Sequence, residues 1–194
     1  ATDNINASLR LLHNDPSLSI DRKVRAIAQV LNNQGILQLS KGEAEQAIAT
    51  WKQAQDSYQQ VGDELGVIRT LINQASAFKQ LGFYRRALKT LAEVESILVE
   101  QPDSEIKIAG LRSYGDILLL VGEVKRSRKI LESSLNIASG LDYVDEQSKI
   151  LLLLGNTYKT HQPEKALKLY QQGLETCQQQ PNCLQTDLLL QIYL

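Results

Sequence analysis

The feature that most constrains the fold of this chain is a set of small residues that recurs every 40 positions. Three such series run along the 194 residues, and the third shortens by one residue in its last step. They are Gly35, Ala75, Gly115 and Gly155; Gly42, Gly82 and Gly122, with Gln162 in the fourth place; and Ala47, Ala87, Ser127 and Ala166. Self-similarity at a fixed period of this length is the signature of a repeat array, in which each unit stacks on the next.

Each 40-residue period predicts two helices joined by a short turn. From Asp63 to Leu81 the apolar residues recur at steps of three and four, which places them on one helical stripe: Leu65, Ile68, Leu71, Ile72, Ala75 and Phe78. Gly82 is predicted to stop this helix, because a residue without a Cβ readily adopts the left-handed conformation. The second helix is predicted to run from near Tyr84 to about Glu100. Its buried face would consist of Ala87, Leu88, Leu91, Val94 and Leu98.

The longer breaks between units also carry residues that end one helix and begin the next. Gly or Pro stops one helix in each break, and Asp63, Ser104 and Asp142 are predicted to cap the N-terminus of the next. The small residue inside each first helix has a packing reason, since two helices approach closely only where one contributes no bulk. A glycine inside a helix costs about 1 kcal/mol relative to alanine, and its recurrence indicates that packing compensates this cost.

These residues resemble the tetratricopeptide repeat (TPR). Its pattern runs from an apolar residue and a Leu-Gly pair through an aromatic residue and a turn glycine to a second helix with aromatic residues and alanines. The fourth unit matches through Leu151, Leu154, Gly155, Tyr158, Ala166, Tyr170 and Gly173. The first matches through Leu31, Gly35, Gly42, Ala47, Trp51 and Ala54, and the second through Leu71, Ala75, Phe78, Gly82, Tyr84, Ala87 and Leu91. The third departs most, with Leu118, Val124, Ser127, Leu131 and Ser134.

The 40-residue form is similar to the repeats of kinesin light chains, of Pins-type polarity adaptors, and of bacterial and cyanobacterial proteins that carry a caspase-like CHAT domain. The resemblance implies an all-α fold, a right-handed α-α superhelix, as in a TPR solenoid. The expected repeats are 19–62, 63–102, 103–141 and 142–181. They are flanked by residues 1–18, as the second helix of a partial repeat, and by residues 182–194, as the first helix of a truncated fifth repeat.

Because both ends cut through repeats and the chain has no Met, we expect a fragment of a longer protein. The alternative is that the terminal helices are capping helices, which repeat arrays use to cover their end faces.

Charge and hydropathy exclude two classes of partner. The 21 Lys and Arg residues balance 22 Asp and Glu residues, so the net charge is −1, and aromatic residues do not interleave with basic ones. Both observations argue against nucleic acid. The longest apolar runs are five residues, far short of the roughly 20 needed to span a bilayer. We therefore expect neither a nucleic-acid partner nor a membrane partner, and no signal peptide.

The sequence offers few candidates for catalytic residues. His13 and His161 lie in or beside loops with no nucleophile or acidic partner at a recognised spacing. The glycines stand singly, so no phosphate-binding loop occurs. We expect no enzyme activity, no cofactor and no metal. In a parent protein of the CHAT type, the His and Cys dyad would belong to a separate domain, and Cys177 is not a candidate for it.

Cys177 and Cys183 flank the break that contains Pro181. Their spacing is too wide for the C-x-x-C of redox or zinc sites. Two alternatives remain: the cysteines form a disulfide with each other, or both are unpaired thiols. Only the disulfide would imply an oxidising compartment, so the location, cytoplasmic or extracytoplasmic, depends on it.

Basic residues gather at the start of two successive second helices. Arg85, Arg86 and Lys89 begin one, and Lys125, Arg126, Arg128 and Lys129 begin the next, 40 residues on. We expect a basic stripe on the convex face, formed by Arg85, Arg86, Lys89, Lys125, Arg126 and Lys129. It would serve an acidic partner or an acidic surface of the same chain. The alternative is a solvated face balanced by Glu93, Glu95 and Glu132.

The resemblance implies a binding groove along the first helices of the repeats. Counting from the small residue, the expected groove residues are Gln29, Asn33, Ile36, Arg69, Asn73, Ser76, Lys79, Arg112, Asp116, Lys149, Asn156 and Lys159, with Asn32 beside them. Asn33 and Asn73 hold one equivalent site, where an amide can bond both an N–H and a C=O of an extended peptide. Only Asn73 fits the carboxylate clamp of chaperone-binding members, which argues against chaperone tails. The alternative for any single residue is plain solvated surface.

The expected function is a non-catalytic protein–protein interaction scaffold that binds a peptide segment or a partner domain of some acidic character. The alternative is a sensory or autoinhibitory array that regulates an effector domain, such as a CHAT domain, in the same parent chain.

Overall fold

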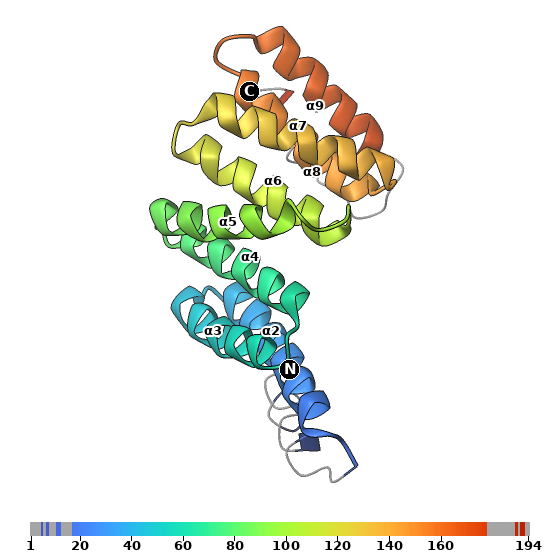
Figure 1. Ribbon diagram of the computed structural model, residues 1–194. Helices are drawn as coiled ribbons and strands as arrows, with labels where there is room; N and C mark the ends of the chain where they lie inside the picture. Colours follow the sequence, from blue (N-terminus) through green and yellow to red (C-terminus); the bar gives the residue numbers. More distant parts are fainter. Residues whose placement is uncertain are drawn as a thin grey trace. The chain divides into compact units, whose positions relative to one another are not determined.

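The computed structural model describes residues 17–177 together with residues 5, 7, 11, 12, 189, 191 and 192. Over these residues the chain forms helices and turns and no strand, so the predicted all-α class is confirmed there (Figure 1). The helices are α2 (Ile20–Ser40), α3 (Ala44–Gln60), α4 (Glu64–Gln80), α5 (Tyr84–Leu98), α6 (Glu105–Leu120), α7 (Val124–Gly140), α8 (Val144–Tyr158) and α9 (Pro163–Cys177). The two terminal half-repeats expected from the sequence fall mostly outside the described residues.

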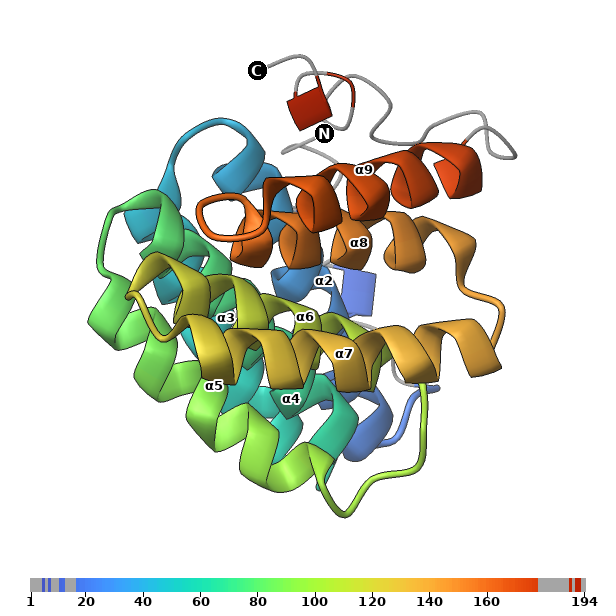
Figure 2. The same ribbon diagram turned by 90° about the horizontal axis from the view of Figure 1, so that it is seen from above.

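The chain divides into two compact units, Ala1–Val94 and Glu95–Leu194, and the boundary falls inside α5. In the first unit α2 packs on α3, α3 packs on α4, and α2 also touches α4. In the second unit α6, α7, α8 and α9 pack in sequence, and α6 also touches α8. The α2–α3 and α6–α7 hairpins are visible in Figure 1, and the α8–α9 hairpin is clearest in Figure 2. We call α2, α4, α6 and α8 the first helices and α3, α5, α7 and α9 the second helices.

Glycine makes the tight turn inside three of the hairpins. Gly42, Gly82 and Gly122 have φ values of 83°, 75° and 85°, in the left-handed region that side chains with a Cβ rarely adopt. The turn at Gly82 also ties the end of α4 back on itself, because the Phe83 N–H donates to the Phe78 carbonyl at 2.8 Å. The prediction that Gly82 stops α4 in this conformation is confirmed.

The glycine in the middle of α2, α6 and α8 lies where a large side chain from the second helix crosses it. A Cβ added at Gly35 would lie 2.5 Å from the indole of Trp51, and one added at Gly115 would lie 2.5 Å from Leu131. A Cβ at Gly155 would collide with the ring of Tyr170. The predicted packing reason for these residues is therefore confirmed. Each of these three helix pairs closes on a bulky side chain that rests against bare backbone.

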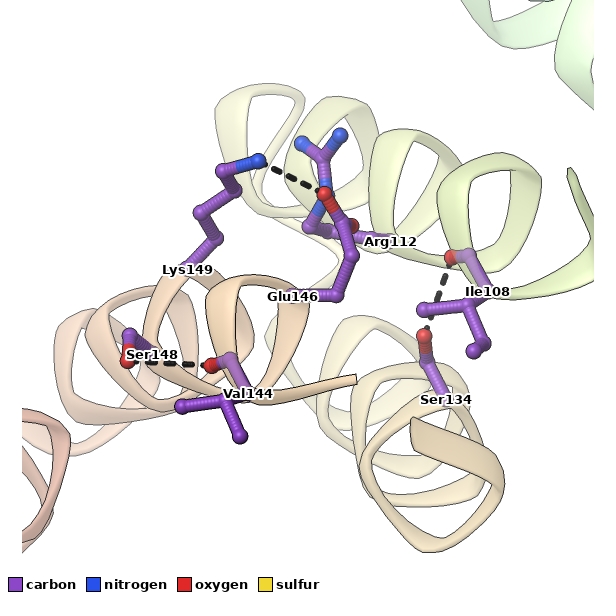
Figure 3. Close-up of polar contacts among 7 residues, drawn as sticks. All are labelled: Ile108, Arg112, Ser134, Val144, Glu146, Ser148 and Lys149. Atoms are coloured by element: carbon purple, nitrogen blue, oxygen red, sulfur yellow. Dashed lines mark hydrogen bonds and ion pairs between the residues drawn. The ribbon is translucent and has the colours of Figure 1, made fainter. Parts of the chain in front are cut away.

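The third repeat compensates for its unusual serines with hydrogen bonds. Ser127 and Ser134 of α7 are fully buried at positions where the first two repeats carry apolar residues, Ala47 and Ala87 for Ser127, and Ala54 and Val94 for Ser134. The Ser127 hydroxyl donates to the Gly115 carbonyl at 2.7 Å, and the Ser134 hydroxyl donates to the Ile108 carbonyl at 3.0 Å (Figure 3). Both polar groups are thus satisfied across the α6–α7 contact, as burial requires.

Of the three predicted N-caps, Asp63 is confirmed, Ser104 holds the N-cap position only, and Asp142 is wrong. Asp63 caps α4, accepting a hydrogen bond from the Gly66 N–H at 2.9 Å. Ser104 is the N-cap residue of α6, without a side-chain cap hydrogen bond. Asp142 does not cap α8, which begins after Tyr143; it has a φ of 58° and occupies the left-handed place that Gly62, two periods earlier, occupies with a φ of 66°. Aspartate tolerates this conformation better than most residues.

Leu65 was predicted to lie on the buried stripe of α4, and this prediction is wrong. Its side chain is 47% exposed, whereas Ile68, Leu71, Ile72 and Ala75 are buried. The reason is the local packing of the first turn of α4, where the neighbouring Gly66 faces the ring of Tyr58.

We expect Gly35→Ala to lower the free energy of unfolding by about 1–2 kcal/mol, because crowding against Trp51 outweighs the gain of about 1 kcal/mol in helix propensity. Gly140, at the end of α7, is the matched control, since a Cβ there meets nothing within 4 Å. Gly140→Ala should be neutral or raise stability by up to about 1 kcal/mol. Urea unfolding followed by circular dichroism measures both. Equal shifts of the two midpoints would contradict the packing role of Gly35.

Candidate functional site

The candidate site is the face of the first helices on which the sequence places the groove residues. We call it the first-helix face and describe it separately in each unit. In the first unit it is carried by α2 and α4, which touch each other, and in the second by α6 and α8, which also touch.

On α2 and α4 the face is built around a pair of asparagines. The Asn73 amide nitrogen donates to the Asn32 side-chain oxygen at 2.9 Å, which links the first helices of successive repeats. Asn32 is only 5% exposed, and its carbonyl accepts a hydrogen bond from the Trp51 indole at 3.1 Å. Deeper in the same unit, Gln74 donates to Gln55 at 2.8 Å. The amides therefore form a satisfied polar layer under the surface, and Asn32 is part of that layer rather than an open contact residue.

The other predicted groove residues of the first unit stand at the surface. Gln29, Asn33, Ile36, Arg69, Ser76 and Lys79 are all exposed. Ile36 is 49% exposed, which is high for a large apolar side chain, and Asn33 next to the buried Asn32 is open to solvent. The surface thus offers amide, hydroxyl, apolar and cationic groups along two neighbouring helices.

On α6 and α8 the centre of the face is a compact charge cluster (Figure 3). The Glu146 carboxylate lies 2.6 Å from the Arg112 Nε and 2.7 Å from the Lys149 Nζ, and its side chain is only 12% exposed. Burial raises the pKa of Glu146, but the charge of Arg112 and the hydrogen bonds from Lys149 and Arg112 outweigh burial and hold this pKa below its usual value. Two cations predicted to face a ligand are therefore already paired with a carboxylate of the chain.

The remaining predicted residues of the second unit are also engaged or half-buried. Asn156 accepts a hydrogen bond from the Tyr170 hydroxyl at 2.8 Å, and Lys159 donates to Gln191 at 3.1 Å. Asp116 is half-buried. The first-helix face is hence more open to a partner on α2 and α4 than on α6 and α8.

Glu146 is the residue that sequence reasoning missed. Its only local signal is the spacing to Lys149, because side chains three positions apart lie on one helix face. The contact with Arg112 spans 34 residues and depends on how α6 lies against α8.

The predicted basic stripe is partly occupied by aromatic partners. Arg126 lies 5.2 Å over the Tyr114 ring, donates to the Tyr114 hydroxyl, and lies 3.5 Å from Glu123 and 3.8 Å from Glu95. Arg86 lies 5.2 Å over the Phe83 ring. Arg85, Lys89, Lys125 and Lys129 are exposed. The residues on α5 belong to the first unit and those on α7 to the second, so their alignment into one stripe stays a prediction.

Tyr158, at the end of α8, holds two cations at once. The Arg128 guanidinium of α7 lies 3.8 Å from the ring centroid, and the Lys165 amine of α9 lies 4.0 Å from it. Arg128 also donates to the Thr157 carbonyl at 3.0 Å. Both are cation–π contacts, in which a positive charge lies over the face of an aromatic ring.

Catalytic and metal-binding candidates stay few in the described part of the chain. His161 is exposed in the turn before α9, and His13 lies outside the described residues. Among the described residues no group of three or more His, Cys, Asp and Glu side chains could hold a metal ion. None of the helices within the described ranges is long and apolar enough to cross a membrane.

Of the two cysteines for which the sequence leaves a disulfide open, the structure describes one. Cys177 is fully buried with Tyr158, Ala166 and Tyr170 at the end of α9. Cys183 lies outside the described residues, so the pairing, and the compartment that depends on it, stay predictions.

We expect Glu146→Gln to lower the free energy of unfolding by about 1–2 kcal/mol at neutral pH, since it leaves Arg112 and Lys149 without their carboxylate. Because the folded pKa of Glu146 lies below its unfolded value, this contribution is complete above about pH 4.3 and is lost as the pH falls through the folded pKa. The difference between wild type and variant should therefore shrink in acid. The exposed Glu132 supplies the control Glu132→Gln. Urea unfolding at neutral and acidic pH measures both variants, and a pH-independent difference would contradict the pairing.

Comparison with known proteins gives a clear result at the level of the fold. No protein-family model matches the sequence, and no curated protein matches it at a significant level. Solved structures do match. BtubC (BKLC) from P. vanneervenii superposes with a TM-score of 0.80 at 14% identity, over 98% of this chain and 78% of that one.

Two further structures extend the likeness. The Rap protein, solved in complex with Competence and Sporulation Factor, gives a TM-score of 0.70 at 13% identity over 88% of this chain and 47% of that one, so the chain spans about half of Rap. A chain from Podospora anserina, assigned as a kinesin light chain with nearly identical TPR-like repeats, superposes with a TM-score of 0.60 at 13% identity. The match covers 92% of this chain and 89% of that one. Together with the helix pairs that close on small residues, these likenesses establish that the described part of this chain has the fold of TPR-like helical-repeat proteins.

Proposed function

We propose that the chain is a non-catalytic protein-interaction scaffold that binds an extended peptide segment along the first-helix face. The observation that carries the proposal is the polar layer on α2 and α4. There, the Asn32–Asn73 pair fixes the spacing of two first helices, and Asn33, Arg69 and Ser76 remain exposed around it. Side-chain amides carry both donors and acceptors and can therefore bond the N–H and C=O groups of a peptide backbone.

A scaffold of this kind gains affinity from its rigidity. The left-handed glycine turns and the bulky side chains packed on Gly35, Gly115 and Gly155 leave each hairpin little freedom. The protein side therefore loses little conformational entropy on binding, and the ordering cost falls on the peptide. That the module is not an enzyme rests on the sequence, which lacks a nucleophile motif and a phosphate-binding loop.

The likeness to known structures supports the proposal only through the fold, because one fold serves many functions. Rap shows that a protein of this fold has been captured with a bound factor. The partner of the present chain, and its acidic character, belong to the proposal alone.

The alternative is a sensory or autoinhibitory array that holds an effector domain of a longer parent chain. The exposed cations Arg85 and Lys89 on α5, and Lys125 and Lys129 on α7, favour it, because they lie on second helices, away from the first-helix face. Under this alternative, substitution of these four residues would change the regulation of the parent, and substitution of the first-helix face would not.

The test is a selection from a library of random displayed 12-residue peptides, followed by fluorescence anisotropy with the selected sequences. We expect peptides that bind the wild type and lose at least tenfold in affinity with Gln29→Ala/Asn33→Ala/Ile36→Ala. These three residues are exposed on α2, and alanine keeps the helix.

The matched control is Lys52→Ala/Asp56→Ala/Gln59→Ala, which removes three exposed side chains of the second helix α3. It should bind as the wild type does. Equal loss in both triple variants, or selection of no peptide, would contradict the proposal. Circular dichroism verifies that the helicity is unchanged.

A further inference from the structure

A mainly apolar hollow of about 360 Å³ lies at the start of α9, in the second unit. Gln191 and Ile192 contribute to its lining, and the Lys159 amine at its rim donates to Gln191 at 3.1 Å. The remaining lining residues belong to α9, and they are Pro163, Ala166, Leu167 and Tyr170. Leu167 is 38% exposed, so the lining includes a large apolar side chain that is open to water. We call this feature the α9 hollow.

The first repeat contains a closed counterpart of the α9 hollow. Gly35 and Gly155 are 120 residues apart, and Ala47 and Ala166 are 119 apart, because the last repeat is one residue shorter at its turn. With these two offsets, Lys159, Pro163, Ala166, Leu167 and Tyr170 correspond to Leu39, Ala44, Ala47, Ile48 and Trp51. All five of these counterparts belong to one apolar cluster of the first unit, which Ala77 and Leu81 complete.

In the first unit the end of α4 covers these side chains. Ala77 is fully buried in the cluster, and Leu81, the residue after α4, packs against it. The Leu81 N–H donates to the Ala77 carbonyl at 3.0 Å, so both residues lie on the same face of one helical turn. Ile48, the counterpart of Leu167, is half-buried in the same cluster. The chain itself therefore shows what such a set of side chains packs against: a small residue and, four positions later, a leucine.

We propose that the α9 hollow binds an amphipathic helix of a separate polypeptide. This helix places a small residue and, four positions later, a leucine or isoleucine against Pro163, Leu167 and Tyr170. Recognition of a helix in a groove commonly uses apolar residues at this spacing. A folded second copy of the chain does not offer its own pair, because Ala77 is buried against α3.

The rim of the hollow explains why the bound helix is amphipathic. Lys159 stands where the first repeat has Leu39, so one edge of the site is cationic rather than apolar. An apolar side chain placed over this edge would bury the amine, which costs free energy unless its hydrogen bonds are kept. We therefore expect a polar residue of the ligand beside Lys159. The hollow shares Lys159 with the first-helix face but no other residue, so binding here does not require a peptide on that face.

The test uses the end of α4 as the probe, in a labelled 18-residue peptide with the sequence of residues 64–81 and an amidated C-terminus. Fluorescence anisotropy should show saturable binding to the wild type that weakens at least tenfold with Leu167→Arg. Arginine is compatible with the fold at this place, since Arg128 holds it in the third repeat. Leu65→Arg, at an exposed leucine of α4 outside the hollow, is the matched control and should bind as the wild type does.

A second measurement changes the peptide and so does not depend on the folding of a protein variant. A copy with Leu81→Asp should bind at least tenfold more weakly, because a carboxylate loses its hydration in an apolar hollow. A copy with Gln80→Ala should bind as the parent peptide does, since Gln80 is exposed next to Leu81 in α4. Urea unfolding verifies that Leu167→Arg is folded.

Each other outcome overturns the inference in a distinct way. Absence of binding, or binding that survives Leu167→Arg and the Leu81→Asp copy, excludes the helix site. Self-association of the protein alone in sedimentation, abolished by Leu167→Arg, would show that the hollow takes a second copy. Loss of probe binding in Gln29→Ala/Asn33→Ala/Ile36→Ala would place the probe on the first-helix face, and leave the scaffold in place. Failure of the peptide selection overturns the scaffold but not this site.

Discussion

Every hairpin of this protein whose first helix carries a central glycine depends on the contact of a bulky side chain with bare helix backbone. Trp51 on Gly35, Leu131 on Gly115 and Tyr170 on Gly155 set how closely the two helices approach. This distance in turn decides which side chains reach from one first helix to the next. The Asn73–Asn32 hydrogen bond and the Arg112–Glu146 ion pair both link first helices of successive repeats, and both require that the layers beneath them are closely packed.

The fold could be predicted from the sequence because the residues that determine it recur in every repeat. The glycine series predicted the turns, and the apolar spacing predicted α4 and α5 to within about two residues at each end. Errors arose where a local position mattered more than the period. The residue type of Asp142 predicts a cap, but its place in the repeat is that of the left-handed Gly62. Leu65 has the right spacing for the core, yet it lies in a first turn where Gly66 receives the packing partner.

The surface contacts were harder to predict from the sequence than the fold, because they join residues far apart in the chain. Counting from the small residue located the first-helix face, but it could not distinguish Asn33, which is exposed, from Asn32, which is buried beside it. Nor could it show that Glu146 neutralises two of the predicted cations. A repeat sequence says which positions share a face, whereas pairing across helices depends on side-chain length and direction, which differ from repeat to repeat.

The ring of Tyr158 has a consequence for how the second unit opens. The ring belongs to α8, and both Arg128 of α7 and Lys165 of α9 lie over it. Helical-repeat proteins open locally, in units set by nearest-neighbour contacts. Detachment of α9 would remove one cation from the ring and expose it to water, which weakens the hold of Arg128 on α7. Opening in this unit should therefore proceed by three helices together rather than by one hairpin at a time, so that a disturbance at α9 is felt as far back as α7.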